Sequence, residues 1–443
     1  MSRLFGTDGI RGVANIDLKP TMAYALGRAT AQQLAGPGGS IVVGQDTRRS
    51  GDMFVAAITA GATSLGVDVH AVGVVPTPAL AFLARNGPYQ GGIMVSASHN
   101  PADDNGLKVL DAEGLKLDDT IEEELEALIW RESELGGVGN GQLGVRVDAA
   151  TAADAYREHR IGLATTIDAS GLHIVLDGAN GSGGALGPGI LAATGARVEA
   201  IHVAPDGMNI NLDCGATAPA SLAAAVADRG ADVGFALDGD ADRLIAVDGR
   251  GQVVDGDQVV GILALERLSR DALPGGLVVS ILSNGALQQA VEAAGGEIVR
   301  TPVGDKYILA GMQVSGATLG GEKSGHVIVM EHTTSGDGIV TALELLRVMT
   351  ARGLPLADLA AAIPLLPQQQ RAVKARHKDQ WEGDAMLRRA IADAASRLGD
   401  AGRVLVRPSG TEPALRVMVE GPDEALVGEL ADTLAALAGE RLN

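Results

Sequence analysis

Residues Val233–Arg243 read VGFALDGDADR, a short apolar run followed at once by three acids and an arginine. The run Val233–Leu237 does not alternate with polar residues, as expected for a strand buried on both faces of a sheet. A buried strand that ends in a polar loop is typical of a doubly wound α/β sheet. Ligands of such sheets bind beyond the carboxyl ends of the strands, where this loop would lie.

The same arrangement occurs three times along the chain. Each copy has an apolar run that ends in a Gly or Asp turn, a helical stretch, a second β-rich run, and a third run that ends in a polar loop. This repetition predicts three similar doubly wound α/β domains around a central cleft, with one large sheet as the alternative. The first runs are Ser40–Asp46, His173–Asn180 and Gly276–Gly285, the second runs are Val67–Val75, Ala196–Val203 and Glu297–Val303, and the loops are Ser96–Pro101 (SASHNP), Asp238–Arg243 and Gly321–His326 (GEKSGH).

The last part of the chain follows a different pattern. After Pro364–Gln370, which we interpret as a hinge, we expect a helix over Asp384–Leu398, a strand–loop–strand over Arg403–Glu420 and a helix over Pro422–Ala438. These elements predict a smaller C-terminal α+β domain that acts as a lid. The expected domains are 1–150 with the SASHNP loop, 151–250 with the acidic loop, 251–368 with the GEKSGH loop and 369–443 with the loop RPSGTEP.

The composition excludes several classes of function. The 443 residues include 35 Lys and Arg against 55 Asp and Glu, a net charge of −20, which disfavours binding to nucleic acid or to anionic membranes. The chain has one cysteine, Cys214, and neither a signal peptide nor a membrane-spanning run is evident. A reducing, cytoplasmic location is therefore expected. The histidines show no paired Cys/His spacing, so zinc chemistry is not expected.

The acidic loop has the pattern of a site for a hard cation. Asp238, Asp240 and Asp242 stand at i, i+2 and i+4, so a tight loop can point their carboxylates at one ion. Oxygen ligands suit Mg²⁺ or Ca²⁺ rather than Zn²⁺. An EF-hand does not fit, because Arg243 stands where that loop needs Gly and Gly249 where it needs Glu. A solvated acidic turn is the plain alternative, but the adjacent Arg243 favours Mg²⁺ with a phosphate ligand.

The SASHNP loop has two interpretations. Ser98 or Asn100 can cap a helix that has Pro101 in its first turn. Alternatively, a serine oxygen that faces the Mg²⁺ site could carry a phosphoryl group. Lys108 follows closely and would lie near the same loop.

Two further loops suit a sugar phosphate. GEKSGH presents a carboxylate, a hydroxyl and an imidazole on a turn with flanking glycines, a set of donors and acceptors that suits sugar hydroxyls, although an ordinary polar turn would look the same. In RPSGTEP, backbone N–H groups, hydroxyls and arginines form a phosphate cradle on an otherwise acidic chain. The cradle residues are Arg407, Ser409, Gly410, Thr411 and Arg416.

Taken together, these motifs resemble those of the phosphohexomutase family along essentially the whole chain. The resemblance rests on FGTDGIRG (Phe5–Gly12) and on the loops SASHNP, DGDADR, GEKSGH and RPSGTEP. One departure is Lys323, where a neutral Gln or Asn is expected. The resemblance implies an isomerase that carries a phosphoryl group on Ser98 and binds Mg²⁺ through Ser98, Asp238, Asp240 and Asp242. It further implies catalytic roles for Lys108, His326, Arg11 and Arg243, sugar binding by Glu322 and Ser324, and binding of the distal phosphate by Arg407, Ser409, Gly410, Thr411 and Arg416.

The resemblance also indicates a substrate. FGTDGIRG, the doubled serine of SASHNP and the segment TSGDGI (Thr334–Ile339) favour a member that interconverts glucosamine 6-phosphate and glucosamine 1-phosphate for UDP-N-acetylglucosamine and peptidoglycan synthesis. Such an enzyme would use glucose or glucosamine 1,6-bisphosphate as activator and could form a homodimer. The alternatives are a phosphomannomutase or phosphoglucomutase, a Mg²⁺-dependent sugar phosphatase, and a non-catalytic binder of sugar phosphate or Ca²⁺.

Overall fold

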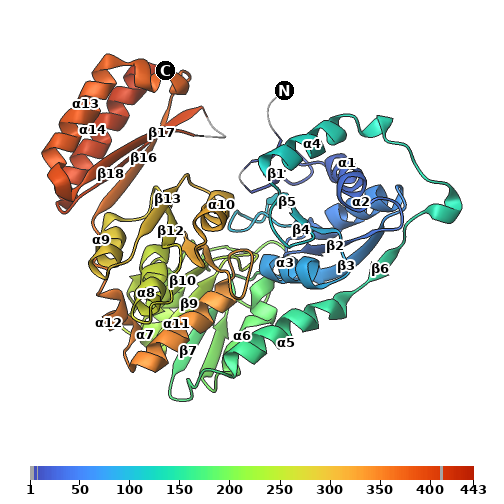
Figure 1. The fold of residues 1–443 in the computed structure, drawn as a ribbon, viewed down its shortest axis with the longest axis horizontal. Coiled ribbons are helices and arrows are strands. Elements are labelled where there is room, and N and C mark those ends of the chain that lie inside the picture. The colour runs from blue at the N-terminus through green and yellow to red at the C-terminus, as the bar shows by residue number, and fades with distance from the viewer. Residues whose placement is uncertain (1–3, 7, 410–412) are drawn as a thin grey trace. The chain divides into compact units, whose positions relative to one another are not determined.

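The computed structural model describes residues 4–6, 8–409 and 413–443. The chain divides into two compact units, one within 1–281 and 294–362 and the other within 282–293 and 363–443. The first unit contains three α/β sheets and the second a smaller three-stranded sheet with helices (Figure 1). The expected fold class, three α/β domains and a smaller C-terminal domain, is confirmed. In the described part of the chain, no helix has the length and apolar composition needed to cross a membrane.

The first sheet has the strand order β1-β5-β4-β2-β3-β6. Strands β4, β2, β3 and β6 run parallel to one another. Strand β5 is antiparallel to β4, and β1 is antiparallel to β5. The last residues of the FGTDGIRG motif, Ile10–Gly12, thus belong to edge strand β1 beside β5. The bounds are Ile10–Val13 (β1), Ser40–Gln45 (β2), Asp68–Val74 (β3), Gly91–Val95 (β4), Asp104–Asp111 (β5) and Arg146–Asp148 (β6).

Helices cover both faces of this sheet. One face packs against α1, α2 and α4 through a core that includes Phe54, Ile93 and Leu125. The other face packs against α3, where glycines of the strands leave room for the side chain of Leu80. Both faces are therefore apolar, which explains why the strands do not alternate. The bounds are Pro20–Thr30 (α1), Gly51–Thr63 (α2), Thr77–Asn86 (α3) and Asp119–Trp130 (α4).

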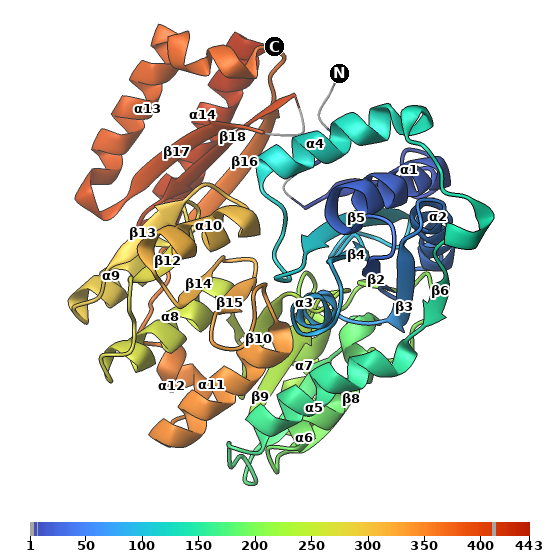
Figure 2. The same cartoon turned by 45° about the vertical axis from the view of Figure 1, so that its right-hand side comes forward.

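The second sheet has the order β11-β10-β9-β7-β8, and its strands β8, β7 and β9 run parallel. Helix α5 leads into it and lies beside α6 (Figure 2). Helix α7 covers one face through Leu222 and Val226. The bounds are Ala153–Ala164 (α5), His173–Asp177 (β7), Gly187–Ala192 (α6), Arg197–Ile201 (β8), Ala220–Arg229 (α7), Val233–Leu237 (β9), Leu244–Asp248 (β10) and Val253–Val254 (β11).

The third sheet has the order β13-β12-β14-β15 and repeats the same plan on a smaller scale. Strands β13, β12 and β14 run parallel, and β15 is antiparallel to β14. The bounds are Gly256–Leu268 (α8), Leu277–Ser280 (β12), Gly285–Ala293 (α9), Ile298–Thr301 (β13), Asp305–Ser315 (α10), Leu319–Gly321 (β14), Val327–Val329 (β15), Gly338–Arg352 (α11) and Leu356–Ala360 (α12).

In each of the three sheets, one parallel strand is followed in the chain by a strand that pairs with it in the antiparallel direction. The SASHNP loop connects β4 to β5, the acidic loop connects β9 to β10, and the GEKSGH loop connects β14 to β15. The structure therefore corrects the interpretation of Ser98 or Asn100 as a helix cap, because strand β5 rather than a helix follows Pro101. Pairing with β4 and β1 determines the conformation of this segment.

The second unit is built around the antiparallel sheet β16-β18-β17. Leu415, Val417 and Val419 alternate along β18 and pack against α13 and α14. The expected hinge Pro364–Gln370 is partly wrong, because its last residues begin strand β16, which pairs with β18. The bounds are Gln368–Lys374 (β16), Ala385–Leu398 (α13), Arg403–Pro408 (β17), Ala414–Glu420 (β18) and Glu424–Leu442 (α14).

Candidate active site

The SASHNP loop holds Ser98 in an unusual backbone conformation. Its φ of 52° lies in the left-handed region, which is rare for a residue with a side chain. The Ser98 N–H donates to Ser96 Oγ at 2.9 Å, and its carbonyl accepts from Arg48 Nη2 at 3.0 Å and from Asn211 Nδ2 at 2.9 Å. Arg48 in turn forms a fully buried ion pair with Asp46. These contacts offset the strain and fix the direction of the Ser98 side chain.

The acidic loop approaches Ser98 from the second domain. Ser98 Oγ donates to Asp238 Oδ2 at 2.6 Å, and both residues are buried. The loop can come this close because residue 239 is glycine, whose Cβ, if present, would lie 2.6 Å from the Ser98 carbonyl oxygen. Ala241 also has a left-handed φ, 57°, which tightens the turn between the second and third acids. The loop thus brings its carboxylates directly under the serine.

The three carboxylates form a cluster that can hold a metal. One oxygen from each of Asp238, Asp240 and Asp242 lies within 4.8 Å of the others, and all three residues are buried. Asp240 Oδ1 and Asp242 Oδ1 are buried and have no hydrogen-bond partner among residues 4–6, 8–409 and 413–443, which is costly for a carboxylate. Burial and the two neighbouring acids raise the pKa of Asp238 to about 8. A hard divalent cation among these oxygens would satisfy the unpartnered atoms and offset the repulsion.

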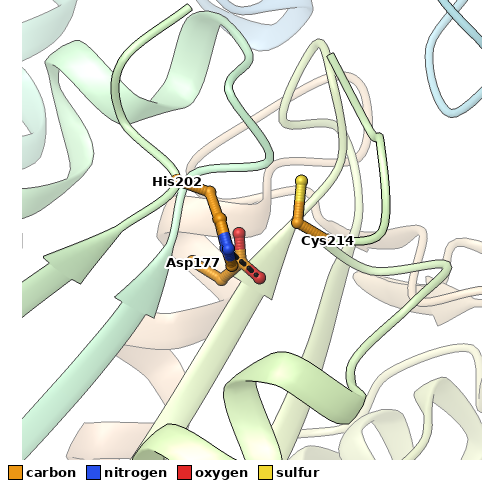
Figure 3. A group of neighbouring side chains, drawn as sticks. All are labelled: Asp177, His202 and Cys214. Carbon is orange, nitrogen blue, oxygen red and sulfur yellow. Dashed lines mark ion pairs between the residues drawn. The ribbon is translucent and has the colours of Figure 1, made fainter. Parts of the chain in front are cut away.

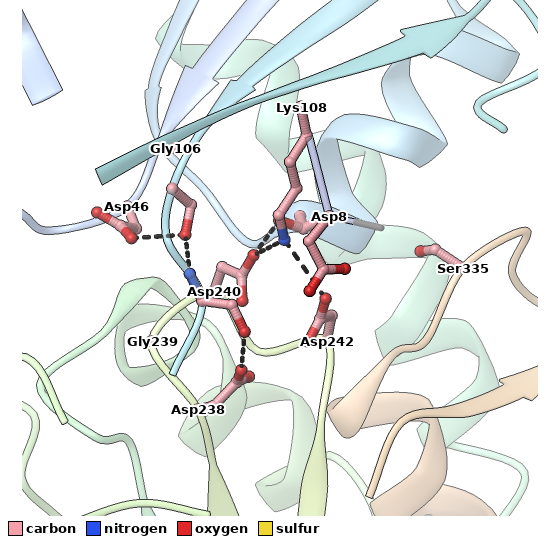
Figure 4. Close-up of polar contacts among 12 residues, drawn as sticks. Asp8, Asp46, Gly106, Lys108, Asp238, Gly239, Asp240, Asp242 and Ser335 are labelled. Carbon is pink, nitrogen blue, oxygen red and sulfur yellow. Dashed lines mark hydrogen bonds and ion pairs between the residues drawn. The ribbon is translucent and has the colours of Figure 1, made fainter. Parts of the chain in front are cut away.

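Lys108 reaches into this cluster from strand β5 of the first domain (Figure 4). Its Nζ lies 2.6 Å from Asp240 Oδ2 and 3.5 Å from Asp242 Oδ2. Burial opposes the charge of this lysine, but the two carboxylates outweigh burial and raise its pKa. Thr77 adds a hydroxyl that donates to Asp240 Oδ2 at 2.6 Å. Both Lys108 and Thr77 therefore join the first domain to the acidic loop.

The GEKSGH loop lies beside the acidic loop. Arg243 and His326 form an isolated antiparallel bridge, and the His326 ring lies 3.8 Å from both Asp242 and Asp305. Burial opposes protonation of His326, but Asp242 and Asp305 outweigh it and raise the pKa of the ring. Arg243 Nε lies 4.0 Å from Asp238 Oδ2 and 3.9 Å from Asp242 Oδ1. The second and third domains thus share one patch of alternating charge.

Glu322 and Ser324 lie on the same loop as His326. The Glu322 carboxylate accepts from the Gly304 N–H at 3.0 Å, and burial raises its pKa. Ser324 Oγ is buried and has no hydrogen-bond partner among the described residues. Lys323 extends toward Asp255, with Nζ 3.8 Å from the carboxylate and about a third of the side chain exposed. The loop therefore offers an acceptor and a hydroxyl at one end of the cluster.

The opening motif contributes an ion-pair chain that sequence reasoning did not assign. Arg11 Nη2 pairs with Asp8 at 3.0 Å, and Arg11 Nη1 donates to Asn100 Oδ1 of the SASHNP loop at 3.4 Å. Asp8 also pairs with Lys116, which in turn pairs with Asp305 next to His326. Lys116 lies more than 100 residues from both Asp8 and Asp305 in the chain, so the motif FGTDGIRG is the one sequence signal that includes Asp8.

His99 is a second residue that the sequence did not single out for a role. Its Nδ1 lies 3.3 Å from Ser98 Oγ. Burial, together with Arg243 and Arg11, lowers the pKa of His99 to about 4, so the ring is neutral near pH 7. A neutral imidazole beside the serine can donate or accept one hydrogen bond.

The phosphate cradle belongs to the second unit and is described here by itself. Arg407 on β17 and Arg416 on β18 are directly opposite each other in the register. Like charges at opposed positions repel, so this pair favours an anion between or beside the two guanidinium groups. Ser409 is buried at the end of β17. Gly410 and Thr411 lie outside the described residues.

The structure brings together one further cluster that the sequence spacing did not reveal. Asp177, His202 and Cys214 offer donor atoms within 4.8 Å of one another (Figure 3). The Asp177 carboxylate accepts from the backbone N–H groups of Ala179 and Gly215, both at 2.9 Å, and lies 3.1 Å from His202 Nδ1. Because the carboxylate is already engaged, this cluster is explained as a junction that ties together the loops after β7 and β8.

This site holds a serine, a cluster of carboxylates and several cations at the loops of three α/β domains, which is the layout of a phosphoryl-transfer enzyme. Models of phosphoglucomutase/phosphomannomutase domains I, II, III and IV match residues 2–136, 154–251, 255–365 and 368–437. The chain therefore belongs to the phosphohexomutase family, a family of isomerases.

Within this family the chain is most like bacterial phosphoglucosamine mutase. It is 50% identical to the phosphoglucosamine mutase of Moorella thermoacetica over 99% of this chain and 98% of the relative. It is 47% identical to that of a Nocardioides species over 98% and 99%. A solved phosphoglucomutase/phosphomannomutase family protein from Burkholderia thailandensis has 28% identity and a TM-score of 0.83, covering 100% of this chain and 99% of that one.

Proposed function

We propose that the protein catalyses the phosphoglucosamine mutase reaction, the interconversion of glucosamine 6-phosphate and glucosamine 1-phosphate through phospho-Ser98. The observation that carries this proposal is the position of Ser98 Oγ, buried and 2.6 Å from Asp238 in the carboxylate cluster. The names of the most similar relatives support the choice of sugar. The product would serve UDP-N-acetylglucosamine and peptidoglycan synthesis.

The reaction is a pair of opposite phosphoryl transfers. In the first, the bond between Ser98 Oγ and phosphorus breaks, a bond from phosphorus to the sugar O1 forms, and the proton of the O1 hydroxyl passes to Ser98 Oγ, which gives a 1,6-bisphosphate. The intermediate then reorients, the bond between O6 and phosphorus breaks, the phosphoryl group returns to Ser98 Oγ, and the serine proton passes to O6. The serine ends as it began, so glucose or glucosamine 1,6-bisphosphate is needed only to load an unphosphorylated enzyme.

The acidic cluster is assigned to Mg²⁺. Asp238, Asp240 and Asp242, together with the oxygen on Ser98, would hold the ion, whose chemistry when bound is to neutralise charge on the phosphoryl group. Phosphoryl transfer needs positioning and charge compensation more than covalent help from the protein. Arg243 supplies a fixed positive charge between two of the acids.

The groups around the cluster provide proton transfer and sugar binding. Lys108 and His326 are the proton-transfer candidates, because each can carry a proton within the charged cluster. Arg11 acts electrostatically from the neighbouring motif through Asp8 and Asn100. Glu322 and Ser324 bind sugar hydroxyls in either orientation of the intermediate.

The cradle of the C-terminal domain is assigned to the phosphate that is not reacting. Arg407 and Arg416 provide opposed positive charges, and Ser409, Gly410 and Thr411 would add hydroxyl and backbone donors. A lid that closes over the intermediate would exclude water and limit hydrolysis of phospho-Ser98.

Two measurements on the purified protein test this function. Comparison of kcat/KM for the 6-phosphates of glucosamine, glucose and mannose should favour glucosamine, and a higher value for glucose or mannose would overturn the substrate assignment. Intact mass after incubation with glucose 1,6-bisphosphate should rise by about 80 Da at Ser98. Release of free phosphate without formation of the isomer would instead identify a sugar phosphatase.

A further inference from the structure

The segment Thr334–Ile339 (TSGDGI) has no part in the proposed chemistry, yet it contacts three domains. Thr334 Oγ1 donates to the Gly114 carbonyl of the first domain at 2.9 Å. The Gly338 N–H donates to the Ala241 carbonyl of the acidic loop at 3.0 Å. The Gly336 N–H donates to His326 Nε2 of the GEKSGH loop, also at 3.0 Å. The segment therefore makes hydrogen bonds to each of the three α/β domains close to the carboxylate cluster.

Gly336 is packed directly against the His326 ring. A Cβ at this position would lie 2.4 Å from the Asp242 carbonyl oxygen and 2.5–2.6 Å from the ring atoms Cε1 and Nδ1. Because the Gly336 N–H donates to Nε2, the lone pair of the neutral ring is on Nε2 and its proton is on Nδ1. Each ring nitrogen faces a carboxylate at the same distance, Nδ1 3.8 Å from Asp242 and Nε2 3.8 Å from Asp305, so the Gly336 N–H is the contact that distinguishes the two nitrogens. The backbone of this segment thus sets both the plane and the tautomer of His326.

Asp337 anchors the segment through both carboxylate oxygens. Oδ1 accepts from the N–H groups of Ile339 and Val340, both at 3.0 Å, and caps helix α11. Oδ2 accepts from Tyr156 Oη at 3.0 Å and from Arg160 Nε at 3.1 Å. The side chains of Arg160 and Asp337 are both fully buried, so the pair cannot exchange its partner for water. A buried charge pair of this kind is strongly disturbed when one member loses its charge.

The anchor comes from a different part of the chain. Tyr156 and Arg160 stand one turn apart on helix α5, which lies before the second sheet. Arg160 Nη1 also donates to the His332 carbonyl at 3.1 Å, just before the segment. Helix α5 therefore holds the chain at His332, two residues before the segment, and at Asp337, the residue directly after Gly336.

We propose that Asp337, held by Tyr156 and Arg160, is a positioning residue that fixes the orientation and tautomer of His326 through the Gly336 N–H. This proposal deepens the proposed function and rests on it for the role of His326. The residue acts through the backbone and touches neither the sugar nor the phosphoryl group.

The test is Asp337→Asn, which keeps an acceptor for the α11 cap but removes the charge opposite Arg160. We expect kcat for glucosamine 6-phosphate to fall about 10- to 100-fold, as for a displaced catalytic group, while KM changes less than about threefold. Long-range proton–nitrogen spectra of histidine-labelled protein, recorded above the raised pKa of His326 so that the ring is neutral, should show Nδ1-protonated His326 in the natural protein and a loss of this single tautomer in the variant. His326→Gln identifies the signals.

Two companion variants separate positioning from loss of stability. Tyr156→Phe removes one hydrogen bond to Asp337 without a charge change, and kcat should fall about two- to fivefold with a smaller change in the spectrum. Val226→Ala, on the buried face of helix α7, should lower Tm but leave kcat and the His326 signals unchanged. If Asp337→Asn does not fold, Tyr156→Phe carries the test.

A kcat within twofold of the natural protein together with an unchanged His326 tautomer in Asp337→Asn would overturn the proposal. The spectra need no substrate, so they distinguish a failure of this inference from a failure of the proposed function. A natural protein that lacks mutase activity but shows the tautomer and its loss in the variant would overturn the function alone.

Discussion

The acidic loop Asp238–Arg243 and the GEKSGH loop Gly321–His326 occupy the same position in two neighbouring domains. Each follows a buried parallel strand and turns back into an antiparallel one. The backbone N–H of Leu244 donates to the Gly325 carbonyl at 3.0 Å, so the two turns are in direct contact. Their chemistry nevertheless differs, since one presents three buried carboxylates and the other a carboxylate, a hydroxyl and an imidazole.

The comparison shows that the fold supplies the position and the loop residues supply the chemistry. Two carboxylate oxygens of the acidic loop have no hydrogen-bond partner in the part of the chain that the structure describes, which favours a cation. The Glu322 carboxylate instead accepts a backbone N–H, and the nearby Ser324 hydroxyl has no hydrogen-bond partner within that same part, which favours a neutral polar ligand. If this division is correct, changes in the two loops should affect different measurements.

The largest effect should come from the serine that the acidic loop faces. Ser98→Ala removes the oxygen that would carry the phosphoryl group, so mutase turnover should fall at least about 1,000-fold even with a bisphosphate activator present. A coupled assay for glucosamine 1-phosphate measures this, and Ser40→Ala, at the far end of strand β2, serves as the control. Full activity of Ser98→Ala would disprove the covalent mechanism.

The next effect should be specific to the acidic loop. Asp240→Asn removes one charge from the cluster and weakens the ion pair with Lys108. We therefore expect kcat to fall about 100-fold and Mg²⁺ binding to weaken at least about tenfold. Isothermal titration with Mg²⁺ measures the second quantity without substrate. Asp228→Asn, an exposed acid on helix α7 of the same domain, should change neither.

The GEKSGH loop should show the complementary behaviour. Glu322→Gln keeps an acceptor for the Gly304 N–H but loses the charge that would bind a sugar hydroxyl, so KM should rise about tenfold. Mg²⁺ affinity, measured as above, should stay within about twofold. A large loss of Mg²⁺ affinity in this variant would show that metal binding and sugar binding are not separated between the two loops.

The smallest effect should come from the residue that departs from the family pattern. Lys323 is partly exposed and its Nζ lies 3.8 Å from Asp255, so Lys323→Gln should change KM and kcat less than about threefold. Steady-state kinetics with glucosamine 6-phosphate provide the check. A change greater than tenfold would place Lys323 among the residues that bind the sugar.

The sequence predicts the repeating units well because each buried strand is a continuous apolar run. It fails where an element is half-exposed or is determined by distant partners. Strand β16 reads QQQRAVK and has almost no apolar signal, so its pairing with β18 could not be foreseen. The helix-cap interpretation of SASHNP, one of the two that the sequence allowed, was wrong because β5 forms its hydrogen bonds with β4 and β1, which local propensity does not reveal.

The residues of the candidate site also differ in whether a local motif or only distant partners reveal them. Ser98 and the three acids stand in dense local motifs, so their chemistry is visible in a few residues. Asp8, Lys116 and Asp305 form one ion-pair chain from distant segments, and no local pattern links them. Asp337 stands within the TSGDGI segment, but its partners on helix α5 lie more than 170 residues earlier in the chain.

The left-handed conformation of Ser98 has a consequence for how the enzyme is reloaded. Its N–H is used by Ser96 and its carbonyl by Arg48 and Asn211, so neither backbone group is available to follow an incoming or departing phosphoryl group. The Ser98 backbone is therefore held by the protein itself, in contrast to phosphate-binding loops whose backbone N–H groups bind the ligand. In the proposed reaction, the phosphoryl group on Ser98 would change direction by rotation about the Cα–Cβ bond while these backbone hydrogen bonds are kept.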